Sequence, residues 1–209
     1  MSAPPIQVRP ARPDDLQAAY DVCLRTGDGG RDATRLYDDP GALGRIYVGP
    51  YLKFEPALAA VAEDSAGVCG YVLGALDSRR FYQRYLEEWI PEIQRQFPAP
   101  PPPPASWTPT QRAYHDYHHP EVFCPEPYED YPSHLHIDLV ARVQGQGLGK
   151  RMIGWLLGEL RARGSAGVHL GMHPDNARAE GFYKKLGFTD LARTGSGSDG
   201  TLYLGLKFR

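Results

Sequence analysis

A strand, a glycine-bearing turn and a helix follow one another directly between residues 133 and 160, and this unit limits the folds open to the chain. Apolar and polar residues alternate from Ser133 to Val140, which is typical of a half-buried strand. One face carries Leu135, Ile137 and Leu139, and the other carries His134, His136 and Asp138. The helix that we expect to begin near Gly147 has an apolar stripe that a sheet would cover. The stripe consists of Leu148, Met152, Ile153, Leu156, Leu157 and Leu160.

The turn between this strand and this helix has the character of an anion site. Free amides at a helix start, together with the positive end of the helix dipole, attract a phosphate, and Gly147 has no side chain to block one. Two common nucleotide loops do not fit. A P-loop needs glycine and a hydroxyl residue where Gln144 and Arg151 stand, and a dinucleotide fingerprint needs glycine where Lys150 stands. Glycine is unfavourable inside helices, so Gly149, Gly154 and Gly158 predict close approach to a strand or ligand.

Two motifs resemble the GNAT superfamily of acyl-CoA-dependent N-acetyltransferases. Gln-x-x-Gly-x-Gly at residues 144–149 is similar to the pyrophosphate loop of that superfamily, and "PDNARAEGFYKKLGF" at 174–188 is similar to its next strand–helix unit. Several further segments resemble the acetyltransferase-like domain found at the C-terminus of O-GlcNAcase. They are "VRPARPDDLQAAYDVC", "VCGYVLGALD", "WIP" and "LYLGLKF". The resemblance therefore covers most of the 209 residues except the middle of the chain.

The resemblance implies a cofactor, acetyl-CoA, and a set of residues that bind it. Its diphosphate would lie over the loop, and its pantetheine arm would lie between two splayed parallel strands, Leu139–Val140 and His169–Met172. The implied binding residues are Leu139, Val140, Gln144, Gln146, Gly147, Leu148, Gly149, Lys150, Asn176 and Tyr183. Asn176 is equally well explained as a helix N-cap. Tyr183 is the implied proton donor to the CoA thiolate, although its ring also fits an ordinary apolar stripe.

The fold expected from these features is α/β (α+β). It is a GNAT-like, mixed and mostly antiparallel central sheet with helices on both faces and splayed parallel strands at the CoA site. We expect strands at residues 6–9, 57–64, 67–77, 133–140 and 167–173, and a final pair across the "TGSGSDG" turn. Helices are predicted at 12–24, between about Pro40 and Tyr51, from Gly147, and at 176–186 with Gly187 closing it. Residues 1–209 form one domain with an insertion at about 78–130.

The insertion has an unusual composition. An aromatic, helical piece that Pro91 should kink or divide is followed by five prolines, Pro100 to Pro104, which predict a polyproline II spacer. Residues 78–130 contain five Arg, no Lys and eight Asp plus Glu, a net charge of −3 without His, which slightly favours a cationic acceptor. We expect the segment to act as a rigid strap that roofs the acceptor site. A ligand for proline-binding domains is the less favoured alternative.

Acetyl transfer to an amine needs a base, because an alkylammonium with a pKa near 10.4 costs roughly 4 kcal/mol to deprotonate at neutral pH. His134, His136 and Asp138 share one face of the strand beside the expected acetyl position, and this "HLH" resembles a strand of serotonin N-acetyltransferase. An imidazole can act as this base because its unperturbed pKa, about 6.5, leaves most of it neutral near pH 7. The alternatives are a polar sheet face satisfied by the insertion, a cleft lined by Tyr131, Glu129 and Asp130, and a proton relay through water.

Other features mainly exclude functions. A net charge of −2 gives no general attraction for nucleic acid. No long apolar segment or signal peptide is evident, so we expect a cytoplasmic protein without a membrane span. Three separated cysteines favour free thiols. His115, His118 and His119 lack the partners of a zinc site, so no metal is predicted. The unidentified amine is the expected second partner, and a homodimer is left open.

Two function classes remain at this point. The first is an acetyl-CoA-dependent N-acetyltransferase that acts on a small-molecule or protein amine by direct attack. The second is a catalytically weak or inactive acetyltransferase-like module that binds CoA or a protein partner. The intact loop and Tyr183 favour the first, and the glutamines in the loop favour the second.

Overall fold

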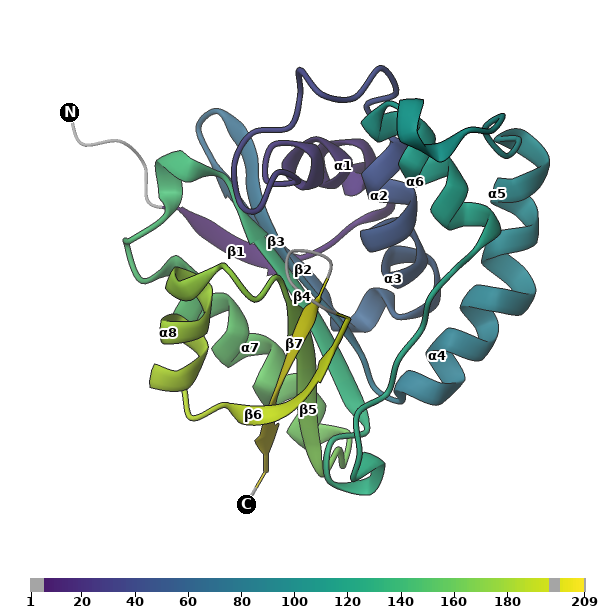
Figure 1. Cartoon of the computed structure of the whole chain (residues 1–209). Coiled ribbons are helices and arrows are strands. Elements are labelled where there is room, and N and C mark those ends of the chain that lie inside the picture. Colours follow the sequence, from purple (N-terminus) through teal and green to yellow (C-terminus); the bar gives the residue numbers. More distant parts are fainter. Residues whose placement is uncertain (1–5, 196–199, 209) are drawn as a thin grey trace.

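A computed structural model describes residues 6–195 and 200–208, which form a twisted central sheet between two groups of helices (Figure 1). In the described chain the sheet has seven strands in the order β1-β2-β3-β4-β5-β7-β6. Their bounds are β1 Gln7–Pro10, β2 Ala59–Asp64, β3 Gly67–Ala75, β4 Ser133–Leu139, β5 Gly167–Met172, β6 Thr189–Thr194 and β7 Thr201–Lys207. The predicted mixed, mostly antiparallel sheet is confirmed, because only β4 and β5 pair in parallel among these strands.

The parallel pair β4–β5 separates soon after it begins. Ser133 pairs with Val168 and His134 with His169, and no pair follows along the two strands. On its other side β4 remains paired with β3 from His134 to Leu139. The strands therefore diverge toward the carboxyl end of β4, which is the splay expected from the family resemblance.

Helices cover both faces of the sheet (Figure 1). On one face lie α7 (Leu148–Ala162) and α8 (Ala177–Lys185), and on the other lie α1 (Leu16–Leu24), α2 (Ala42–Tyr47) and α3 (Gly49–Phe54). Fully buried Leu156 of α7 packs against Gly74, where an added Cβ would come within 2.7 Å of it. The single helix predicted between Pro40 and Tyr51 is instead two, because Val48 leaves the helical region (φ −127°, ψ −53°) and Pro50 starts a new turn.

The insertion contains α4 (Ser78–Arg84), a π-helical turn (Tyr85–Trp89), α5 (Ile90–Gln96) and α6 (Pro109–His118). Pro91 does not divide the first helical segment. The π turn directly precedes it, so the missing N–H of proline falls where the hydrogen-bond register already changes. The proline run is not a continuous polyproline II spacer either, because Pro104 opens a 3-10 turn and the Trp107 indole N–H donates to the Pro101 carbonyl at 2.6 Å.

The insertion packs on the rest of the domain through several buried side chains. Tyr117 of α6 is 1% exposed, and its hydroxyl donates to the Ala42 carbonyl at 2.7 Å. Phe81 of α4 and Ile90 of α5 are also buried. Removing residues 78–130 would therefore expose apolar surface on α2 and α3.

Three further expectations have mixed outcomes. Close approach to a strand is confirmed for Gly149, whose added Cβ would lie 3.5 Å from Leu139 of β4 and 3.2 Å from the Phe182 ring of α8, whereas an added Cβ at Gly154 or Gly158 meets no protein atom within 4 Å, so no strand approaches these two. Ser196 to Asp199 of the predicted last turn lie outside the described residues. None of the helices in the described ranges combines the length and hydropathy needed to cross a bilayer.

One ion pair fixes the first strand to the helical face. The Arg9 guanidinium on β1 contacts the Asp15 carboxylate at 2.7 and 2.8 Å, and both side chains are nearly buried. The Arg12 amide also donates to Asp15 at 2.7 Å. The hydrogen bonds from Arg9 are the main reason that the Asp15 pKa is lowered from its usual value.

We expect Asp15→Asn to lower the free energy of unfolding by about 2–3 kcal/mol, because it leaves a poorly solvated guanidinium with one partner fewer. The contribution of a carboxyl group with a lowered pKa is complete above about pH 4 and is lost as pH falls through the folded-state pKa. Urea unfolding between pH 2 and 7 should therefore give stability curves for the variant and the wild type that run parallel above about pH 4 and converge as the pH falls toward 2. The exposed neighbour Asp14 provides the control Asp14→Asn, and equal losses in both variants would contradict the assignment.

Candidate active site

The turn before α7 presents unpaired backbone amides. Gly145 and Gly147 both have φ +77°, a conformation that favours glycine, and Gly147 is the N-cap residue of α7. Within the described chain, the N–H groups of Gly147, Leu148, Gly149 and Lys150 have no hydrogen-bond acceptor, and the first bond comes from Arg151 to Gly147 at 3.1 Å. Four consecutive free amides at a helix N-terminus form an anion site.

The glutamines of the loop are structural. Gln144 donates from Nε2 to the Leu139 carbonyl at 2.7 Å and accepts from Arg178 of α8 at 2.8 Å. Gln146 donates to the Arg142 carbonyl at 3.0 Å. Their side chains thus brace the loop.

Of the three cations nearest to the loop in sequence, only Lys150 remains beside it. Arg142 pairs with Asp64 at 2.9 Å and Arg151 donates to the Ile6 carbonyl at 2.6 Å, so both are directed elsewhere. Lys150 is exposed beside the free amides. Arg178, which sequence reasoning missed, is brought to the loop by the packing of α8, and its position two residues after the predicted N-cap Asn176 was the available signal.

Asn176 and Tyr183 occupy the two ends of α8. Asn176 is an N-cap, as its alternative interpretation predicted, and its Oδ1 accepts from the Ala179 amide at 3.0 Å. Tyr183 is 8% exposed and packs against Phe182 and Phe188. Its hydroxyl has no hydrogen-bond partner in the described residues. Burial, with a smaller effect of Asp138, raises the pKa of Tyr183, so the phenol keeps its proton at neutral pH.

The backbone of β4 beside the splay is only partly free. The Val140 amide donates to the Cys69 carbonyl at 3.0 Å, so it faces β3 and cannot serve a ligand in the gap. Because backbone groups alternate along a strand, those of Leu139 and Ile137 face the gap. The Leu139 carbonyl already accepts from Gln144.

His136 and Asp138 form a polar cluster with a tyrosine from the neighbouring strand. The Tyr71 hydroxyl on β3 donates to the Asp138 carboxylate and lies 3.1 Å from His136 Nε2, and His136 Nε2 is 3.2 Å from Asp138 Oδ2. The Tyr71 hydroxyl gives its hydrogen to Asp138, so the Tyr71 oxygen and the Asp138 carboxylate can both only accept from His136 Nε2. His136 Nε2 therefore carries the ring hydrogen, and His136 Nδ1 keeps a free lone pair. Burial, then Asp138, raises the pKa of Tyr71 well above its usual value, so it remains a donor.

Tyr71 was missed from the sequence because its role depends on the register that places it opposite Asp138. Tyr47 of α2 stacks on His136 with ring centroids 5.7 Å apart, and it was missed because only the packing of α2 against the sheet brings the two rings together. Cys23 of α1 adjoins this cluster but remains a thiol, since burial is the main cause that raises its pKa to about 12.

His134 lies deeper than His136. It is 3% exposed, whereas the His136 side chain is 30% exposed. Tyr82 of α4 stacks on the His134 ring at 5.0 Å, and Phe81 and Tyr51 contact its ring edge-on. Burial lowers the pKa of His134 well below its usual value, with smaller effects from His169 and His136. His134 therefore stays neutral, and of the three polar residues on this face His136 and Asp138 are the more accessible.

The insertion forms one wall beside these residues. Tyr82 covers His134, and Phe123 packs on Tyr203 of β7 with ring centroids 4.5 Å apart. Exposed Leu86, Val122 and Phe123 line a shallow groove next to Tyr82. His115 and His119 stack on each other, and the described residues contain no group of three or more His, Cys, Asp or Glu that could hold a metal.

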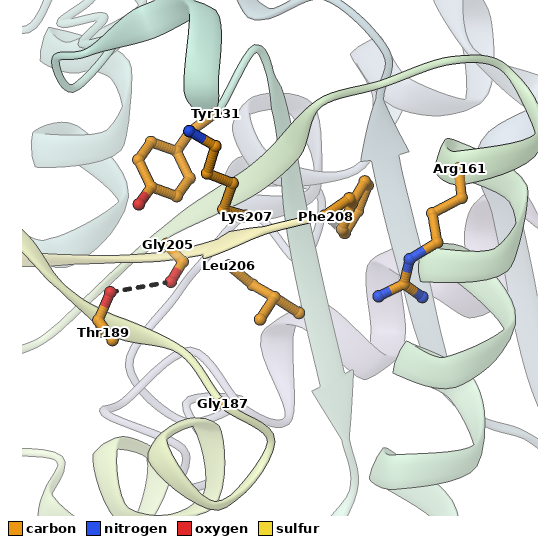
Figure 2. A pocket seen from close by; sticks show the side chains of 8 residues that line it. All are labelled: Tyr131, Arg161, Gly187, Thr189, Gly205, Leu206, Lys207 and Phe208. Carbon is orange, nitrogen blue, oxygen red and sulfur yellow. Dashed lines mark hydrogen bonds between the residues drawn. The ribbon is translucent and has the colours of Figure 1, made fainter.

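A cavity of about 600 Å³ lies at the other end of α7, far from the loop (Figure 2). Arg161 lies on one side of it and Tyr131 on the other, and the main lining comes from the ends of β6 and β7. Arg161 lies thirteen positions, roughly 20 Å along the helix axis, after Leu148 at the start of α7. Arg161 stacks on Phe208 and Lys207 pairs with Asp130, so both cations are already engaged. The cavity contains none of the candidate catalytic residues.

Comparison with known proteins now decides the family. The chain matches the profile of the Acetyltransferase (GNAT) family over residues 38–188. The chain belongs to the GNAT acetyltransferase family. Acetyl transfer is accordingly its general reaction class, and the chain is an acyltransferase by fold and family.

Individual GNAT relatives support the assignment. The crystal structure of SsHAT is 40% identical, with a TM-score of 0.86 and 98% of each chain covered. Protein O-GlcNAcase from Rattus norvegicus is 29% identical over 187 residues, which are 89% of this chain but only 20% of that protein. The chain thus spans about a fifth of the length of that curated relative. The yncA structure from Salmonella typhimurium, with its cofactor acetyl-CoA, shares the fold at 15% identity and a TM-score of 0.56, covering 97% and 93% of the two chains.

The Tyr71–Asp138 hydrogen bond gives a prediction about this GNAT site. Tyr71→Phe should lower the free energy of unfolding by about 1–3 kcal/mol, because Asp138 loses a donor in a largely buried setting. Tyr47→Phe is the matched control, since Tyr47 contacts the same imidazole through its ring and should change stability by less than about 0.5 kcal/mol. Chemical denaturation of both variants measures the difference. A loss in Tyr71→Phe no larger than in Tyr47→Phe would show that the bond is not formed in solution.

Proposed function

We propose that this GNAT-family chain is an acetyl-CoA-dependent N-acetyltransferase that transfers an acetyl group to an amine by direct attack. The observation that carries the proposal is the run of four free amides at Gly147–Lys150 next to the gap between β4 and β5. Free helix N-terminal amides fit a diphosphate, and a strand edge in a splay fits the amide-bearing pantetheine arm. The bound acetyl-CoA seen in the yncA structure agrees with this use of the fold.

The chain's own residues would divide the binding of acetyl-CoA between backbone and side chains. The amides of Gly147, Leu148, Gly149 and Lys150 would hold the diphosphate, with Lys150 and Arg178 supplying positive charge. The strand edge at Leu139 would pair with the pantetheine arm. Asn176 keeps its Nδ2 group available while its Oδ1 caps α8, so it can serve both roles.

Acetyl-CoA supplies the acetyl thioester when bound, and the protein has to move two protons. His136 would take a proton from the attacking amine at Nδ1, because Nε2–H is held by Asp138 and Tyr71. Asp138 orients the imidazole and stabilises its charged form. Tyr183 would give its proton to the departing sulfur, and its raised pKa keeps that proton in place until then.

A module that binds CoA without turnover is the competing proposal. Its support is the absence of cationic side chains at positions 144 and 146, where the family motif usually places them. Calorimetric titration with acetyl-CoA, followed by turnover assays on a panel of amines, separates the two. Binding without acetylation of any amine would favour the module.

Gly147→Val should abolish acetyl-CoA binding in calorimetry, because the side chain would project among the amides that hold the diphosphate. Gly147 has φ +77°, so the variant is also strained, and its melting temperature must be measured alongside. Gly154→Val is the control in the same helix, since an added Cβ there meets nothing within 4 Å. Unchanged affinity in a folded Gly147→Val protein would overturn the loop assignment.

Tyr183→Phe should lower kcat by on the order of 100-fold and leave the acetyl-CoA dissociation constant nearly unchanged, because only the proton donor is removed. Phe182→Leu, next to Tyr183 on α8, is a control for disturbed packing. Steady-state kinetics with the accepted amine and calorimetry provide the two constants. An unchanged kcat would exclude Tyr183 as the acid.

His136→Ala should flatten the acidic limb of the pH profile of kcat/KM, because a protonated imidazole cannot take the proton of the amine. His118→Ala is the control, since His118 lies on α6 and contacts the Phe97 carbonyl at 2.9 Å instead of the cleft. An acidic limb identical to that of the wild type would transfer the base role to Asp138 or to solvent.

A further inference from the structure

Two buried imidazoles face one another where β4 and β5 part. His134 and His169 are register partners in the last pair of the parallel ladder, so their side chains lie on the same face of the sheet. Their ring centroids are 5.7 Å apart, and the residues are 3% and 2% exposed. From the sequence, His169 is predicted only as part of a strand. The gap assigned to acetyl-CoA begins at the next residue of each strand.

The hydrogen bonds of the two rings fix their tautomers. His169 Nδ1 lies 2.8 Å from the Tyr131 carbonyl oxygen, which can only accept, so Nδ1 carries the hydrogen. The Ser78 hydroxyl donates to the Pro132 carbonyl at 2.8 Å, so its oxygen accepts from His134 Nδ1 at 2.7 Å. Each ring therefore directs a bare Nε2 lone pair into the interior.

These two Nε2 atoms lack a partner. Across residues 6–195 and 200–208, they are the buried side-chain nitrogen or oxygen atoms that have no hydrogen bond. A buried acceptor without a donor costs about 1–3 kcal/mol, and native structures leave few of them. Burial lowers the pKa of both rings, so neither is satisfied by taking up a proton near pH 7.

We propose that His134 and His169 together bind one water molecule, which donates one hydrogen to each Nε2 and turns its oxygen toward the gap between β4 and β5. At ordinary hydrogen-bond lengths such a water would hold the two nitrogens about 4.6 Å apart, and the ring centroids are 5.7 Å apart. The rings of Tyr51, Phe81 and Tyr82 enclose His134 on the helical side. The strands stop pairing after His134 and His169, so the oxygen of the proposed water would face the gap that opens there.

A water held in this way can act toward the gap only as a hydrogen-bond acceptor. With both hydrogens committed to imidazoles, its oxygen accepts an N–H from the amine substrate and turns the nitrogen lone pair toward the thioester. This second role rests on the proposed acetyltransferase function. His134 and His169 act as positioning residues here, while the proton itself goes to His136.

The water site is tested on the protein without substrates. Nitrogen NMR of histidine-labelled protein should show Nδ1–H with an unprotonated, hydrogen-bonded Nε2 for both rings, and a high-resolution crystal structure should show one water between them. An Nε2–H tautomer in either ring, or a bare Nε2 without a hydrogen bond, would overturn the site. These readouts are independent of acetyl-CoA, so they stand even if the proposed function fails.

The positioning role is tested with two substitutions of His169. His169→Asn keeps a donor for the Tyr131 carbonyl and removes the acceptor at the Nε2 position, whereas His169→Gln restores an acceptor oxygen near that position. We expect kcat/KM for the amine to fall about tenfold in His169→Asn and to recover in part in His169→Gln, with the acetyl-CoA dissociation constant unchanged in both. His115→Asn on the exposed side of α6 controls for loss of a histidine. An unchanged kcat/KM in His169→Asn would overturn the role, and equal losses in the Asn and Gln variants would reduce His169 to a structural residue.

Discussion

The interruption of hydrogen bonding between β4 and β5 is the constraint on which the site depends. After two residue pairs the strands diverge, although β4 stays paired to β3 and β5 stays paired to β7 from Gly167 to Met172. A sheet can open in its middle in this way only if each half is held by other strands and by helices. The β1–β4 half is covered by α7 and by α1, and the β5–β7 half is tied to it through the short ladder at Ser133 and His134. The unpaired edges that result are a cost to the fold, and in the proposed function they offer an amide-bearing ligand a strand to pair with.

The polar face of β4 shows how the same strand serves packing at one end and chemistry at the other. His134, at the paired end, is enclosed by aromatic rings and has lost access to solvent. His136 and Asp138 lie two and four residues further, beside the gap, where both remain partly exposed. Burial differs along this one strand, so His134 is a neutral hydrogen-bond acceptor whereas the more exposed His136 can exchange a proton. The buried Tyr71 hydroxyl donates a hydrogen bond to the Asp138 carboxylate and brings no charge of its own.

Features determined by local sequence could be predicted, and features determined by distant partners could not. The β4–loop–α7 unit, the β2–β3 hairpin and α8 with its Asn176 cap all follow from short-range periodicity and capping. The course of the insertion did not follow from its prolines, because the π turn absorbs Pro91 and the contacts of α6 with α2 decide where the segment packs. Tyr71, Arg178 and His169 were missed because each gains its role from a residue at least 34 positions away. Open space at Gly154 and Gly158 likewise could not be read from helix composition.

The glutamines that seemed to weaken the phosphate loop have an explanation in the structure. Gln144 joins the last carbonyl of β4 to Arg178, so the amide at this position links the strand, the loop and α8. A lysine or arginine at position 144 could donate to Leu139 but could not accept from Arg178, and it would repel that guanidinium. A cation is thus held at the loop by the first turn of α8, through the contact of Arg178 with Gln144. The glutamines at 144 and 146 are therefore compatible with the proposed cofactor site, because they brace the loop and Arg178 brings a positive charge to it.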